Sequence, residues 1–195
     1  MGPELFETMR SAWLEVAARF EAYRLVLPGS PQFICQPDVC TAYCCHAYSV
    51  GMSEADVERM RRFERLEPVD FLELDENRQP IALPLAHPYL LARSENRCKL
   101  LRQDLSCGAY DGRPNACRLY PHFVVFWDSE AGRVLTTPSP DCQAAFDTLL
   151  GGGDPHPLPL LLGHSECPGF TGPPLSSAHW DAIFRQTYQL QYAAL

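Results

Sequence analysis

The nine cysteines of this chain limit its fold more than any other sequence feature. They are Cys35, Cys40, Cys44, Cys45, Cys98, Cys107, Cys117, Cys142 and Cys167. Three of them fall within the short stretch from Cys40 to Cys45, and most have Pro, Asp, Gly or Asn nearby. These residue types are typical of turns. The concentration of thiols in turn-like segments has three explanations: disulfide bonds, ordinary burial or metal binding.

The residues favour metal binding among these explanations. Disulfides persist in oxidising compartments, whereas the chain opens without the pattern of an export signal and its cysteine count is odd. We therefore expect a cytoplasmic protein. Cysteines that act as small hydrophobes would be scattered through apolar runs. A loop can wrap close-set thiolates around one metal centre without straining a helix or strand, so we expect thiolate ligation.

The adjacent pair Cys44 and Cys45 raises a further expectation. Neighbouring side chains diverge in both strands and helices. We therefore expect the two thiols to serve different partners, either two metals or one metal and a separate structural or redox role. Thiolates on a divalent ion leave a negative site, so Arg113 and Arg118, which flank Cys117, are candidate cofactor-binding residues beside the ligands. The alternative is that both are ordinary surface arginines.

Charge and hydrophobicity argue against nucleic-acid and membrane partners. The net charge is -8, and the arginines of the segment 58–67 are interleaved with glutamates, which is the pattern of a solvated helix face. No stretch approaches the roughly 20 apolar residues that a membrane span needs. With 195 residues, of which 46% are hydrophobic, the chain is expected to form a single domain over 1–195.

Hydrophobic periodicity predicts an α+β fold with helices at both ends. Apolar residues recur at steps of three and four in both terminal segments, and Ser53 followed by Asp56 predicts a helix that begins after Ser53. Hairpins are expected over 71–85, 98–110 and 122–137, and a short helix over 141–150. The expected regions are an N-terminal helix within 1–27, a cysteine-cluster metal-binding region over 31–170 and a C-terminal helix over 176–195.

Several of these segments resemble the YkgJ-type cysteine-cluster family, which is described as a zinc- or iron-chelating CxxCxxCC domain. The resemblance covers about residues 33 to 170 and rests on Phe33-x-Cys35, the Cys40 and Cys44-Cys45 group, CKLLRQDLSC, GRPNACRLYP and CPGFTG. It implies metal ligation by Cys35, Cys40, Cys44, Cys45, Cys98, Cys107 and Cys117. Either Cys142 or Cys167 would be a further ligand.

The first cysteine group departs from the common family spacing. The family usually has C-x2-C-x2-CC, whereas this chain has C-x4-C-x3-CC, which is similar to the opening of flagellin lysine-N-methylases. In those relatives, methyl transfer is associated with an iron–sulfur cluster and S-adenosylmethionine. The expected cofactor is therefore an iron–sulfur cluster, of the [4Fe-4S] type, or zinc. Spacing alone does not separate the two, because both accept sulfur ligands.

Three functional hypotheses follow. The chain is a metal-binding accessory protein, or a cluster-dependent enzyme that modifies a protein or peptide in the manner of a SAM-dependent protein lysine methylase, or a thiol redox sensor. No hydrolase, zinc-protease, P-loop or dinucleotide motif is present, so no catalytic residue is assigned. His46 and His122 lie near cysteines and are weaker candidate ligands. The oligomeric state is not predicted.

Overall fold

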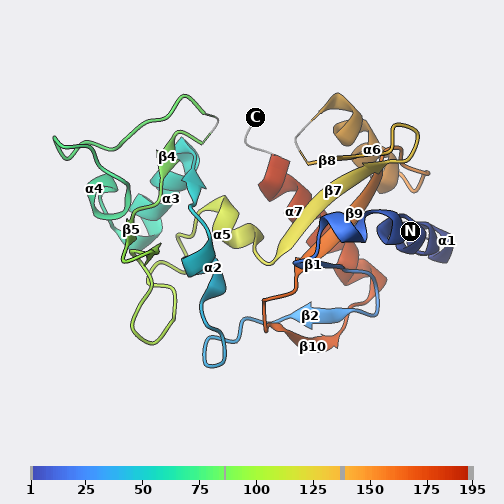
Figure 1. Cartoon of the computed structure of the whole chain (residues 1–195), viewed down its shortest axis with the longest axis horizontal. Coiled ribbons are helices and arrows are strands. Elements are labelled where there is room, and N and C mark those ends of the chain that lie inside the picture. Colours follow the sequence, from blue (N-terminus) through green and yellow to red (C-terminus); the bar gives the residue numbers. More distant parts are fainter. Residues whose placement is uncertain (1, 86, 137–138, 193–195) are drawn as a thin grey trace. The chain divides into compact units, whose positions relative to one another are not determined.

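A computed structural model describes residues 2–85, 87–136 and 139–192, and its ribbon is drawn in Figure 1. The described chain forms two compact units. The first unit runs to Ile34 and resumes at Pro121, and the second unit spans Cys35–Tyr120. The mixture of helices and short strands confirms the predicted α+β class. The predicted single domain over 1–195 stays a prediction, and each unit is described by itself.

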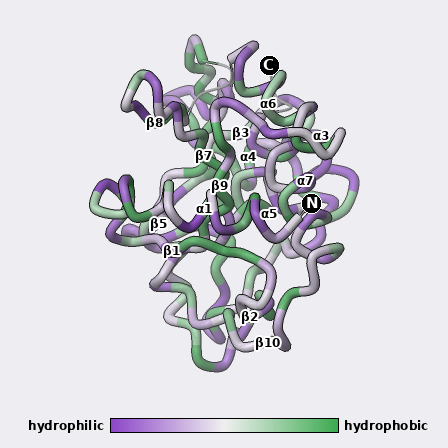
Figure 2. Tube along the Cα trace, turned by 90° about the vertical axis from the view of Figure 1, so that its right-hand side faces the viewer, coloured by the Kyte–Doolittle hydropathy of each residue, from purple (hydrophilic) through white to green (hydrophobic). Residues whose placement is uncertain are grey.

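The first unit is built on a four-stranded antiparallel sheet. Its order is β1 (Tyr23–Leu25), β9 (Leu158–His164), β7 (His122–Asp128) and β8 (Arg133–Leu135). All residues of β9 are buried, and so are four consecutive residues of β7. Because neighbouring residues of a strand face opposite sides of a sheet, both faces of these central strands are covered. Figure 2 shows hydrophobic stretches of the tube along β7 and β9.

The helices of this unit contact one another through aromatic side chains. They are α1 (Pro3–Val16) with a 3-10 turn η1 (Ala17–Arg19), α6 (Pro140–Leu150) and α7 (Ser177–Tyr192). Phe6 packs edge-on against Trp180, with ring centroids 5.3 Å apart, and Phe146 stacks on Tyr188 at 3.8 Å. Such pairs contribute about 0.5–1.5 kcal/mol beyond simple area burial. A separate two-stranded sheet pairs β2 (Pro31–Phe33) with β10 (Phe170–Pro174).

The predicted terminal helices exist but differ in extent. The N-terminal helix ends at Val16, and its 3-10 extension ends at Arg19, because the chain is then drawn into the sheet as β1. The predicted C-terminal helix over 176–195 is α7, and its last predicted residues, 193–195, lie outside the described residues. The predicted helix over 141–150 is α6, and the predicted hairpin after residue 122 is the β7–β8 pair.

The second unit consists of short elements. They are α2 (Tyr43–Ala47), β3 (Gly51–Met52), α3 (Glu54–Glu64), α4 (Pro68–Phe71), β4 (Tyr89–Leu90), β5 (Arg93–Ser94), β6 (Arg97–Cys98) and α5 (Asn115–Leu119). The pairs β3–β4 and β5–β6 form two-stranded sheets. The buried hydrophobic cluster of this unit is small: Met52, Val57, Met60, Phe71, Leu72, Leu91 and Ala109. Most of the backbone around the cysteines is therefore irregular.

The predicted helix cap and hairpins of this unit can be compared with the structure. Ser53 caps α3: its side chain accepts from the backbone N–H of Asp56, and Asp56 reciprocates, so the predicted capping box is confirmed. The hairpins predicted over 71–85 and 98–110 have less strand pairing than expected. Each is held by a single isolated bridge, Leu74 with Pro80 and Leu101 with Cys107.

Candidate metal centre

The cysteines divide between the two units. Seven of them lie in the second unit: Cys35, Cys40, Cys44, Cys45, Cys98, Cys107 and Cys117. Cys142 and Cys167 lie in the first unit, where both are buried. None of the nine, all of which lie within the described residues, is joined to another by a disulfide bond. The disulfide explanation is therefore not realised in this structure.

Cys142 has the surroundings of a core residue. It lies on α6 within the hydrophobic cluster of the first unit and is fully buried. Its Sγ accepts a hydrogen bond from Ser139 Oγ at 3.2 Å, and its backbone N–H donates to the same oxygen. Cys167 follows β9, and its backbone N–H donates to the carbonyl of His164.

Short elements present the thiols of the second unit. Cys44 and Cys45 lie on α2, which begins after Ala42 in the left-handed region at a φ of 55°. Cys98 lies on β6, which packs beside α2. Cys107 faces Leu101 across a narrow turn, and Cys117 lies on α5. Segments far apart in the sequence thus bring thiols into one unit.

The adjacent pair does not diverge as expected. The Sγ atoms of Cys44 and Cys45 lie 4.0 Å apart. Two sulfurs bound at about 2.3 Å to one tetrahedral zinc ion lie about 3.8 Å apart, so this pair has nearly the spacing of two ligands on a single ion. Among the described residues, however, no three His, Cys, Asp or Glu side chains converge on one position as a ready metal site.

The Cys45 thiol links its two neighbours. A hydrogen bond shared with Cys45 lowers the pKa of Cys44 to about 7, and one shared with Cys45 lowers the pKa of Cys98 to about 6. The same two hydrogen bonds raise the pKa of Cys45 itself. Cys44 and Cys98 are therefore the thiols best prepared to be thiolates, the form that binds metals.

Cys107 and Cys117 belong to the same electrostatic neighbourhood. Burial raises the pKa of Cys117 to about 12, and the charges of Cys98, Cys44 and Cys107 add to this effect. Burial is also the main cause of the raised pKa of Cys107, to which Cys98 and Cys44 contribute. A metal cation reverses such shifts, because it stabilises each thiolate directly. We call Cys44, Cys98, Cys107 and Cys117 the thiol quartet.

The remaining two thiols lie at the start of this unit. Cys35 is exposed, and its pKa is raised by burial of part of the thiol and by the charge of Cys40. The charge of Cys44 also acts on Cys35. The backbone N–H of Cys40 donates to the carbonyl of Gln36, which closes a turn between the two cysteines.

Arg113 is the cation of this neighbourhood. Its charge lowers the pKa of Cys35, Cys44, Cys107 and Cys117 and so opposes the effect of burial. Its guanidinium lies 3.6 Å above the ring of Tyr110, and its Nε donates to the Tyr110 carbonyl at 2.8 Å. The sequence indicated Arg113 from its position but gave no sign of Tyr110. Arg118 is exposed in the last turn of α5.

Thiol alkylation should follow these pKa shifts. In a short pulse given directly after chelation, while the second unit is still folded, Cys44 and Cys98 are expected to react with iodoacetamide more than about tenfold faster than Cys117 at neutral pH, because their lowered pKa leaves more thiolate. Timed alkylation followed by peptide mass spectrometry measures the three rates. Equal rates, or a faster Cys117, would contradict the assignment, and bound metal should slow all three.

The histidines differ in their surroundings. His46 lies on α2, directly after the cysteine pair, and its carbonyl accepts from Arg93. His122 lies in the first unit against the rings of Phe33 and Phe170, and burial lowers its pKa to about 4. Neither side chain is placed among the thiols by a contact.

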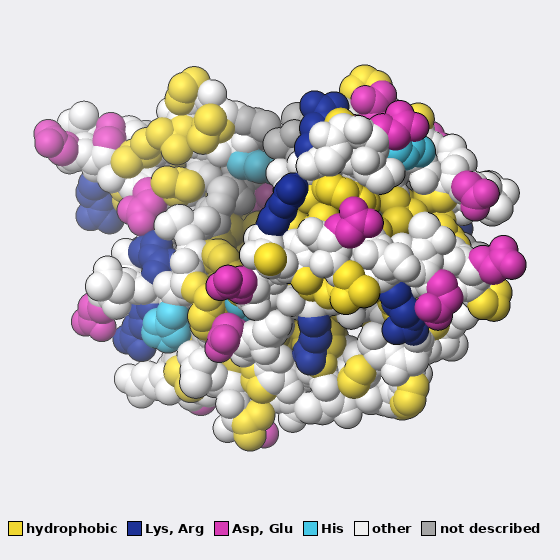
Figure 3. All heavy atoms as spheres, turned by 45° about the vertical axis from the view of Figure 1, so that its right-hand side comes forward, with side chains coloured by type: hydrophobic (Ala, Val, Ile, Leu, Met, Phe, Trp, Pro, Cys, Tyr) yellow, Lys and Arg dark blue, Asp and Glu magenta, His cyan; other side chains and the backbone are white. Residues whose placement is uncertain are grey.

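The surface has no single strongly charged face in the view of Figure 3. Arginine and acidic side chains are interspersed there. The expectation that nucleic acid is not a partner stays a prediction. Among the described helices, none combines the length and the apolar character needed to cross a membrane.

Comparison with known proteins agrees with the thiol chemistry. The family model "CxxCxxCC: Putative zinc- or iron-chelating domain" matches residues 34–143, which is more than half of the chain. The matched range includes Cys142 but not Cys167. Searches of curated proteins and of solved structures gave no match. The chain belongs to the CxxCxxCC family of zinc- or iron-chelating domains, and the predicted resemblance is confirmed.

Proposed function

We propose that this chain is a cysteine-cluster protein that holds an iron–sulfur cluster through thiolates of its second unit. The observation that carries this proposal is the gathering of thiols in the second unit, where the Sγ atoms of Cys44 and Cys45 lie 4.0 Å apart and β6, which carries Cys98, packs beside α2. The quartet supplies four thiolates, the number that [2Fe–2S] and [4Fe–4S] clusters take.

The arrangement of the thiols supports a cluster over a single zinc ion. A zinc site needs its donors to converge on one point, and no three donors of the described residues do so. The thiolates of a cluster bind different irons and therefore spread around a larger centre. In this proposal Cys45 stays a hydrogen-bond partner of Cys44 and Cys98 and is not a ligand, while Cys35 and Cys40 are further ligands.

The chain's own residues have defined roles around the bound group. The cluster, when bound, crosslinks the loops of the second unit and supplies one-electron redox chemistry. Arg113 offsets the negative charge of the thiolates. Cys142 and Cys167, which lie in the first unit, are not part of the proposed ligand set.

Elemental analysis of anaerobically purified protein tests the proposal. We expect brown protein that contains iron and acid-labile sulfide, with visible absorption that bleaches on reduction. Colourless protein with stoichiometric zinc would replace the cluster by a zinc site. Protein that purifies without either metal and does not gain one on reconstitution would overturn metal binding by the quartet.

Two other functions are tested with the same material. The C-x4-C-x3-CC spacing favours a SAM-dependent protein-modifying enzyme with a protein or peptide substrate, so calorimetry with S-adenosylmethionine is the direct test. A flat titration of loaded protein removes that function. The 4.0 Å approach of Cys44 to Cys45 favours a redox sensor, which requires a change in free-thiol count on mild oxidation.

A further inference from the structure

The segment 112–119 carries Cys117, and we call it the corner. It is attached to helix α3. Gly112 begins this corner: its backbone N–H donates to Glu64 Oε1 at 2.7 Å. A Cβ at Gly112 would lie 2.7 Å from Glu64 Cγ, so any larger residue would displace the Glu64 side chain from this contact. The corner ends in α5, where the backbone N–H of Cys117 donates to the carbonyl of Pro114. The position of the Cys117 thiol therefore depends on how the corner is held.

A buried carboxylate on α3 receives the start of α5. Asp56 is 1% exposed. One of its oxygens accepts from the backbone N–H and the hydroxyl of Ser53, which completes the helix cap. The other oxygen accepts from the backbone N–H of Asn115 at 2.9 Å and pairs with Arg59. Asp56 thus has one oxygen for its own helix and one for the corner.

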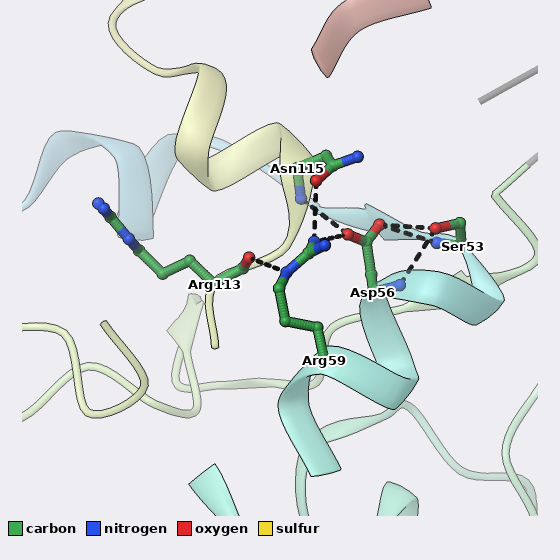
Figure 4. Close-up of polar contacts among 5 residues, drawn as sticks. All are labelled: Ser53, Asp56, Arg59, Arg113 and Asn115. Carbon is green, nitrogen blue, oxygen red and sulfur yellow. Dashed lines mark hydrogen bonds and ion pairs between the residues drawn. The ribbon is translucent and has the colours of Figure 1, made fainter. Parts of the chain in front are cut away.

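Arg59 completes the connection. Its Nε donates to the carbonyl of Arg113 at 3.1 Å, and its Nη2 donates to the side-chain oxygen of Asn115 at 2.9 Å. The planar guanidinium therefore spans Asp56 and the corner, as Figure 4 shows. The side chain of Arg113 points away from this network in the same view. We call Asp56, Arg59 and Asn115 the clamp.

The cost of burying charge indicates that the clamp serves more than stability. The cost of desolvation cancels most of the attraction in a buried ion pair. Apolar residues of the same volume often stabilise a protein equally well. The Ser53 cap needs only Asp56, so Arg59 is not required to begin α3. All the hydrogen bonds of Arg59 beyond Asp56 go to the corner that holds Arg113 and Cys117.

We propose that the Asp56–Arg59–Asn115 clamp is a positioning device that fixes Cys117 and Arg113 for metal binding. The inference rests on the proposed function of the thiol quartet. Partners one step removed from metal ligands typically change metal affinity by about 10- to 100-fold when they are lost. Here the clamp holds both a proposed ligand, Cys117, and Arg113, the cation that offsets the charge of the thiolates.

Replacing Arg59 tests the clamp. In Arg59→Gln the helix cap remains while the ion pair and the link to the Arg113 carbonyl are lost. We expect this variant to release its metal to EDTA about 10- to 100-fold faster than the wild-type protein, as measured by elemental analysis of timed samples. Arg61→Gln is the matched control, because Arg61 lies on the same helix, is 48% exposed and pairs with Glu58 at 3.5 Å.

A second readout separates positioning from general stability. After reconstitution with iron and sulfide, the sulfur-to-iron charge-transfer absorption of Arg59→Gln should weaken, while that of Arg61→Gln should not. Arg59→Lys keeps the charge beside Asp56 but has no fork to reach both Arg113 and Asn115. In metal-loaded protein it should restore the hydrogen-exchange protection of α3 without restoring the release rate.

The outcomes distinguish this inference from the proposed function. A wild-type protein that binds no metal overturns both. A wild-type protein that binds metal, with Arg59→Gln and Arg61→Gln releasing it equally fast, overturns the clamp alone. If Arg59→Gln does not fold, Asn115→Ala replaces it, since the backbone bond to Asp56 remains in that variant. Wild-type release from Asn115→Ala would then overturn the clamp, and accelerated release would support it.

Discussion

Stripping the metal should unfold the second unit and leave the first unit folded. The second unit has a hydrophobic cluster of seven buried residues and strands of two residues each. The first unit has a much larger core around β7 and β9. A structural metal contributes about 10–16 kcal/mol in zinc-finger peptides, which is comparable with the whole stability of a domain. Without it, the irregular segments of the second unit have few other stabilising contacts.

The tryptophans allow the two units to be followed separately. Trp13, Trp127 and Trp180 all lie in the first unit, two of them in its buried core. Tryptophan fluorescence should therefore stay native after chelation under anaerobic conditions. Hydrogen exchange, read by peptide mass spectrometry, should show loss of protection within 43–119. Retained protection in α3 and α5 after complete metal loss would contradict a structural role for the metal.

Restoring the metal is the control for this experiment. Readdition of iron and sulfide, or of zinc, should return protection to the second unit, because binding and folding are coupled. Damage to the thiols by oxidation would block this recovery. A sample kept under reductant without chelator separates the two effects.

Local sequence patterns predicted much of the fold. The steps of three and four in the terminal segments predicted α1 and α7, and Ser53 with Asp56 predicted the start of α3. The β-rich runs around Gly132 predicted the hairpin of β7 and β8. These features depend on neighbours in sequence, so a single sequence contains them.

Long-range pairings were not predicted. The segment that forms β9 was not predicted to be a strand, yet all its residues are buried and it lies between β1 and β7 in the sheet. A short apolar run does not by itself distinguish a buried strand from a connection, because the distinguishing contacts come from distant segments. The same reason explains why β1 was included in the N-terminal helix.

For the candidate site, too, local features were predicted and contacts between distant segments were not. Cysteine spacing predicted a shared neighbourhood for the thiols, but it did not separate Cys142, which lies in a hydrophobic core, from Cys117. The arginines of α3 were interpreted as a solvated face. That interpretation fits Arg61 but not Arg59, which is 18% exposed and bonded to a segment more than fifty residues away. Interleaved charges reveal no distant partner.

Cysteine substitutions should separate the two units by their effects. We expect Cys117→Ser and Cys98→Ser to lower metal affinity by more than about 100-fold, because each removes a proposed ligand. Cys40→Ser should also destabilise the second unit through weakened metal binding. Elemental analysis after dialysis against a metal buffer measures the loss, and hydrogen exchange reports the stability of the second unit.

Cys142→Ser is the matched comparison, because it makes the same atomic change in the other unit. It places a hydroxyl in the core beside Ser139, which should cost about 1–3 kcal/mol of stability. That cost should appear in the tryptophan-detected unfolding of the first unit, with metal content unchanged. Cys167→Ser should behave in the same way. If Cys142→Ser instead loses metal as fully as Cys117→Ser, then Cys142 is a ligand and its burial in the apolar core requires another explanation. If all the variants keep their metal and melt alike, the thiols do not hold it.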